Sequence, residues 1–138
     1  MTYERDAEHW LLKFSPDEWL ARSLRELERA EAGFQQRNAA AAHAGLKRAA
    51  GMALNAALIA APNESWGRTY VEHVRAVSEG SGAAPDAVRE AATKLLQLPV
   101  SAASVVMLRT PARERELIEA ARTVMSYAYA IARRGRAE

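Results

Sequence analysis

Two arginine–histidine pairs in the chain have a spacing that could support RNA chemistry. His43 follows Arg37 by six residues, and His73 follows Arg68 by five. A histidine with a pKa near neutrality can move the proton of a ribose hydroxyl, while an arginine stabilises the charge that develops on the phosphorus. A chain with so many arginines also produces this spacing by chance. The alternative for each pair is therefore a surface arginine and a histidine that packs in a helix or faces water.

An aromatic and basic cluster gives a second candidate site. Trp66, Arg68 and Tyr70 lie close together in a segment that reads PNESWGRTY, and such residues can stack on a base or anchor a partner protein. The alternative is a loop tryptophan that folds back over the core. The three histidines form no His-x3-His motif and the chain has no cysteine, so we expect no metal site and no cofactor.

Composition indicates one soluble globular domain spanning residues 1–138. Hydrophobic residues make up 49% and charged residues 26% of the chain, and the net charge is only +2. The longest uncharged apolar run, Ala49 to Pro62, is shorter than the roughly 18 residues that a membrane-spanning helix requires. The N-terminal residues lack the pattern of a signal peptide, so we expect a cytoplasmic protein that does not contact membranes.

An alanine-rich stretch, Asn38 to Ala61, is predicted to form the central helix of a bundle, and this helix must position the candidate site residues. Small residues recur along it at four-residue spacing, which lets a neighbouring helix approach closely. Polar side chains occupy only a narrow strip, formed by Lys47, Arg48 and Asn55. The small residues form a ridge that consists of Ala41, Gly45, Ala49, Ala53, Ala57 and Ala61.

The stretch before the central helix predicts one long amphipathic helix. Ser15 to Glu18 has the sequence of a capping box, with proline at the first helical position. The helix should run from Pro16 to about Ala32 and end at Gly33. Residues 1–14 should form a strap or a short helix. We expect an inward face of Leu20, Leu24, Leu27 and Phe34, and an outward face of Glu18, Arg22, Arg25, Glu26 and Arg29.

The remaining sequence predicts three further helices. Thr69 and Glu72 resemble a second capping box, which opens a short helix with Tyr70, Val71, Val74 and Val77 facing inward. Another helix begins at Pro85. A last helix begins at Thr110 and Pro111 and should run to about Arg134, followed by a tail of residues 135–138, whereas residues 100–110 remain ambiguous. The predicted fold is an all-α, single-domain, up-and-down bundle of about four to five helices.

From Trp19 to Arg134 the chain resembles the HEPN family of helical nucleotide-binding domains. The segments WLARSLRELERAEAGF, AAGMALNAALIA and WGRTYVEHVRAV are similar to successive parts of the family pattern, and Arg109-Thr110-Pro111 is similar to its Arg-Tyr-Pro turn. Ribonuclease members carry an arginine and, four to six residues later, a histidine near the start of the last helix. Here no histidine follows residue 73. The chain also has Gly51, Met52 and Asn55 where members often carry glutamate and lysine.

The resemblance implies a non-catalytic HEPN-like binding module, dimeric, that works with a nucleotidyltransferase or binds a nucleotide or RNA. Arg109 then joins Trp66, Arg68 and Tyr70 as a candidate ligand or partner contact. One alternative is a toxin-type, metal-independent ribonuclease that uses Arg68 and His73, as in a toxin–antitoxin pair. The other is a structural bundle without a ligand.

A homodimer is expected from surplus apolar surface on the last helix. One apolar seam suffices to dock a helix on its own bundle, yet this helix carries a second set of apolar residues beside the first. We expect Met125, Tyr127 and Tyr129 at the interface, with the two tyrosines on opposite faces of the helix. The competing possibility is that the N-terminal segment, with Trp10 and Phe14, covers this surface within the monomer.

Overall fold

The computed structural model describes residues 10–98 and 111–137, and this part of the chain is helical without a strand. It therefore confirms the predicted all-α, single-domain bundle. No helix in these ranges is long and apolar enough to cross a membrane. The α-helices are α1 (Pro16–Gln35), α2 (Ala39–Ala60), α3 (Tyr70–Ser78), α4 (Asp86–Leu96) and α6 (Pro111–Ala137), and the short 3-10 helices are η1 (Trp10–Lys13), η2 (Glu64–Trp66) and η3 (Ser81–Ala83).

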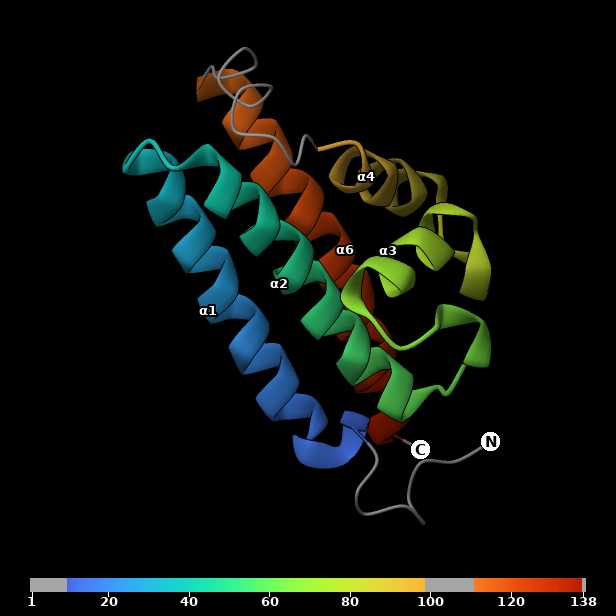
Figure 1. The fold of residues 1–138 in the computed structure, drawn as a ribbon. Coiled ribbons are helices and arrows are strands. Elements are labelled where there is room, and N and C mark those ends of the chain that lie inside the picture. Colours follow the sequence, from blue (N-terminus) through green and yellow to red (C-terminus); the bar gives the residue numbers. More distant parts are fainter. Residues whose placement is uncertain (1–9, 99–110, 138) are drawn as a thin grey trace.

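The central position of α2 is confirmed, since it contacts α1, α3, α4 and α6. Figure 1 shows α1, α2 and α6 as long helices that run alongside one another, with the shorter α3 and α4 packed to one side. Ala49, Ala53 and Ala57 of the small ridge are buried, as predicted. The two ends of the ridge differ, because Ala41 and Ala61 are exposed. The core is therefore built around the middle of an alanine surface.

The predicted capping box begins α1. The Ser15 hydroxyl accepts the Glu18 backbone N–H at 3.1 Å, and the Glu18 carboxylate accepts the Ser15 backbone N–H at 3.0 Å. The predicted end at Gly33 is wrong, since α1 continues to Gln35. Gly33 instead allows close contact with α2, because a Cβ there would lie 3.3 Å from the Ala42 Cβ. The chain reverses at Arg37, whose φ is 60°.

Several predicted faces are corrected by the packing. Leu24 and Val71 were expected in the core but are 56% and 41% exposed. Leu24 lies at the outer edge of α1 beside α6, and Val71 lies in the first turn of α3. Glu26 was expected on the outward face of its helix and Asn55 in the polar strip of the central helix, but both are buried because neighbouring helices cover them. The last helix also continues through Gly135, since a single glycine in a helix costs only about 1 kcal/mol.

Candidate functional site

Trp66 is buried at the corner between α2 and α3. The side chain is 3% exposed, and its indole Nε1 donates a hydrogen bond to the Ser81 hydroxyl at 3.0 Å. Its backbone carbonyl accepts a hydrogen bond of 2.7 Å from His73 Nδ1. Trp66 therefore folds back over the core, the alternative considered for it, and does not offer its ring face to a ligand in this conformation.

The imidazole of His73 lies inside the protein. Burial lowers the pKa of His73, and the hydrogen bond to the Trp66 carbonyl opposes that shift only in part. The neutral tautomer with the proton on Nδ1 follows, because a carbonyl can only accept. Arg68 is exposed, with its backbone N–H 3.4 Å from the Glu72 carboxylate. The structure does not bring Arg68 and His73 together as a surface pair that could reach a phosphodiester.

The other arginine–histidine pair is divided in the same way. Arg37 is exposed at the turn between α1 and α2, whereas His43 is buried and packs edge-on against the Phe34 ring, with 5.7 Å between centroids. Within residues 10–98 and 111–137 no cluster of histidine and acidic residues could hold a metal ion. Arg109, the remaining candidate contact, lies outside the described residues.

Tyr70 packs against α2, where Gly51 makes room for it. A Cβ at position 51 would lie 2.6 Å from the Tyr70 Cγ, closer than real Cβ contacts allow. Burial raises the pKa of Tyr70; the charge of Glu26 raises it further, while those of Arg48 and Arg22 lower it. The phenol therefore lies within electrostatic range of all three charged side chains. The glycine that was expected to reflect a lost charge therefore seats an aromatic ring.

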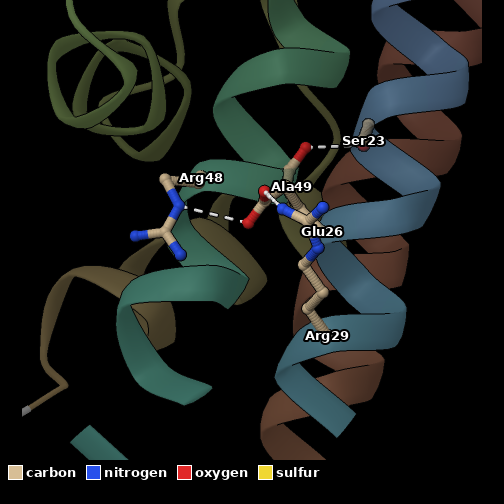
Figure 2. A network of polar contacts seen from close by, with 5 residues as sticks. All are labelled: Ser23, Glu26, Arg29, Arg48 and Ala49. Atoms are coloured by element: carbon tan, nitrogen blue, oxygen red, sulfur yellow. Dashed lines mark hydrogen bonds and ion pairs between the residues drawn. The ribbon is translucent and has the colours of Figure 1, made fainter. Parts of the chain in front are cut away.

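Glu26 is the centre of a polar cluster that joins α1 to α2 (Figure 2). Its carboxylate is paired with Arg29 at 3.1 Å and with Arg48 at 3.2 Å. The Ser23 hydroxyl donates to the Ala49 carbonyl at 2.6 Å in the same contact. Both carboxylate oxygens are thereby occupied, which makes burial of this charge tolerable. We call Arg22, Glu26, Arg48 and Tyr70 the arginine–tyrosine cluster.

Arg22 completes the cluster through stacking. Its guanidinium carbon lies 3.7 Å from the centroid of the Phe14 ring. Phe14 in turn packs edge-on against Trp19, with ring centroids 4.9 Å apart. Phe14 therefore packs at the start of α1 against a small cluster that includes Ala132 of α6, and it does not line the groove around Met125.

An apolar groove of about 340 Å³ runs between α1 and α6 on a different side of α1. Tyr129 and Leu24 at its edge are 47% and 56% exposed, whereas Met125 is 8% exposed at its base. Tyr127 does not line the groove; it is half-buried against the core, and burial raises its pKa. The lining of this α1/α6 groove consists of Leu20, Leu24, Leu27, Arg122, Met125, Ser126 and Tyr129.

A larger open hollow, about 520 Å³, lies between α3 and α4. Most of its charged residues form ion pairs: Arg89 lies 3.7 Å from Asp86, and Lys94 lies 3.2 Å from Glu116 on α6. The Lys94 ammonium lowers the pKa of Glu116, as expected for a surface ion pair. The hollow is therefore best described as a solvated face.

Comparisons with known proteins give no relative whose function could be compared with these surfaces. Searches of protein-family models, curated proteins and solved structures each return no match for the chain.

Proposed function

We propose that this protein is a non-catalytic interaction module of the HEPN-like type, and that it self-associates through the α1/α6 groove. The observation that carries the proposal is the groove itself, where Leu24 and Tyr129 expose apolar surface around a buried Met125. Monomeric proteins rarely leave such surface without a partner, and aromatic and methionine side chains are enriched in interfaces. The resemblance to HEPN proteins, which often dimerise, points in the same direction.

Charge along the exposed stripe of α6 favours a second copy of the chain as the occupant. Five exposed residues recur every three or four positions along it. If two α6 helices pack antiparallel about a two-fold axis near Ser126, Glu119 lies opposite Arg133 of the partner subunit, and the reverse pair forms at the other end. Opposite charges at symmetric positions make the surface self-complementary. The stripe consists of Glu119, Arg122, Ser126, Tyr129 and Arg133.

The burial of both histidines argues against the ribonuclease alternative. General acid–base catalysis requires an imidazole within hydrogen-bond reach of the reacting hydroxyl. His43 is 6% exposed and His73 is 0% exposed, so neither meets that condition in this conformation. Association with a nucleotidyltransferase, which the resemblance implies, remains a prediction for which a pull-down with a genomic neighbour is the direct test.

Light scattering during size-exclusion chromatography tests self-association. We expect a mass near twice 15.1 kDa at micromolar concentration, reduced to a single copy by Leu24→Glu or Tyr129→Glu. Val71→Glu is the matched control, because Val71 is also an exposed apolar residue, 41% exposed, but belongs to α3. A wild-type mass of one copy would refute the proposal.

A charge exchange identifies the occupant. Glu119→Arg and Arg133→Glu should each weaken the dimer, because each places like charges opposite one another. The double variant should restore the dimer, because it again places opposite charges at these two positions. A dimer that is indifferent to all three variants would show that α6 does not pack antiparallel on α6. In that case the Leu24→Glu result alone would decide whether the chain associates through the groove.

A further inference from the structure

We infer that the arginine–tyrosine cluster binds a phosphate group of a nucleotide or polynucleotide. The cluster lies on the opposite side of α1 from the α1/α6 groove, so this inference does not depend on self-association. It is carried by three side chains at adjoining positions on three helices. Arg22 is one turn before Glu26 on α1, and Arg48 of α2 pairs with Glu26. Tyr70 of α3 packs on Gly51, one turn after Arg48.

Arg22 is ordered without using its hydrogen-bond donors. Its guanidinium is held over the Phe14 ring at 3.7 Å, and among the described residues it has no hydrogen bond or ion pair. Stacking fixes the plane of the guanidinium while its N–H groups remain at the edge of that plane. Less side-chain freedom is then lost when a ligand binds. An exposed arginine that is held in this way can bind an anion with little further ordering of its side chain.

Arg48 is positioned by a different contact with the same result. Its Nε donates to the Glu26 carboxylate at 3.2 Å, and the side chain is 46% exposed. The two terminal nitrogens of its guanidinium make no hydrogen bond or ion pair within the described ranges. A planar fork of N–H groups matches the oxygens of a phosphate better than a single ammonium does.

Glu26 does not cancel the positive charge of this face. Its two oxygens are occupied by Arg29 and Arg48, so one carboxylate is set against three guanidinium groups when Arg22 is included. The nearby Glu18 carboxylate is engaged by the backbone of Ser15 in the helix cap, which lowers the pKa of Glu18. The face therefore remains net positive, as binding of a phosphate requires.

Tyr70 supplies a neutral donor within electrostatic range of the two arginines. Its side chain is half-buried, and its phenol makes no hydrogen bond with the described part of the chain. Because the pKa of Tyr70 is raised, the hydroxyl keeps its proton and can donate it to a phosphate oxygen. Two forks and one hydroxyl give a set of donors suited to the several oxygens of one phosphate group.

Fluorescence anisotropy with a labelled single-stranded oligoadenylate RNA tests the site. At low salt we expect binding that weakens as salt is added. Arg22→Ala and Arg48→Ala should each weaken it by about tenfold, the effect of losing one charge-assisted hydrogen bond. Arg115→Ala on α6 is the matched control: it removes the same charge from another exposed position and should change binding by less than about twofold. Tyr70→Phe should weaken binding while leaving the seat at Gly51 filled.

Competitors distinguish the source of the phosphate. Displacement by AMP but not by adenosine supports phosphate recognition, and displacement by inorganic phosphate as well shows that the anion alone suffices. Displacement only by longer oligonucleotides indicates a polynucleotide backbone. Three results would overturn the inference: no binding at low salt, competition by adenosine equal to that by AMP, or equal effects of Arg22→Ala and Arg115→Ala. Arg22→Ala breaks no ion pair within the described ranges, so it is the variant that separates loss of binding from loss of folding.

Discussion

Replacing Gly51 by alanine tests how closely α3 is fitted to α2. Alanine is the best helix-forming residue, so in an unobstructed helix this change would stabilise the protein by about 1 kcal/mol. Here the new methyl group would lie 2.6 Å from the Cγ of Tyr70, whereas ordinary contacts begin at 3.4 Å. The ring must move away from α2, and the two effects have opposite signs.

The steric effect should exceed the gain in helix propensity. Overpacking a closely packed contact costs about 1–3 kcal/mol. Displacement of a half-buried aromatic ring loses about 1 kcal/mol more of apolar burial. After the gain of about 1 kcal/mol from propensity, we expect Gly51→Ala to lower the free energy of unfolding by about 1–3 kcal/mol.

Urea unfolding measures this change, and a second substitution isolates its cause. In a Tyr70→Gly background the obstructing side chain is absent, so Gly51→Ala should be neutral or should stabilise by about 1 kcal/mol. The difference between the two backgrounds is the energy of the contact. If Gly51→Ala raised the stability of the otherwise unaltered protein, Tyr70 would not lie on Gly51 and the position of the arginine–tyrosine cluster would be wrong.

Three further predictions concern the core and the histidines. Ala53→Leu should destabilise the protein by about 1–3 kcal/mol in the same urea assay, whereas Ala44→Leu on the exposed side of α2 should cost less than about 0.5 kcal/mol. Because burial lowers the pKa of His73 from 6.5, the unfolded chain takes up a proton below that pH that the folded chain does not, so stability should fall as pH drops below 6.5 and His73→Gln should reduce the slope. The protein should not cleave RNA without metal; cleavage that His73→Ala abolishes and His43→Ala leaves intact would contradict the structural argument.

Helix beginnings could be predicted because caps are local. Ser15 and Thr69 each accept a hydrogen bond from a glutamate three residues later in the chain, and both starts were recognisable from the sequence. Helix ends were less predictable. Gly33 and Gly135 both occur within helices, since whether a glycine terminates a helix depends on what packs against it.

The candidate sites depended on contacts that no sequence pattern contains. Glu26 has the spacing of an outward residue, and only the approach of Arg48 from α2 makes its burial possible. Leu24 has the spacing of a core residue, yet it lies at the edge of the α1/α6 groove and stays exposed. A glycine within an alanine-rich helix was the one available signal for the arginine–tyrosine cluster, since Gly51 is the kind of position at which another group approaches closely. Trp66 was ambiguous because its environment is set by Ser81 and His73.

The alanine surface of α2 reverses the usual vulnerability of a protein core. Most cores are damaged when a large side chain is shortened and leaves a cavity, but an alanine can lose only its methyl group. Alanine also loses no rotamer freedom on burial, so ordering the middle of α2 carries almost no side-chain entropy. Substitutions that enlarge side chains are then the main threat along Ala49, Ala53 and Ala57, and any enlargement must push a whole helix aside. Substitutions along the buried face of this helix should therefore be confined to small residues. The larger side chains that α1 and α6 pack against it can vary in size, provided that their combined volume is kept.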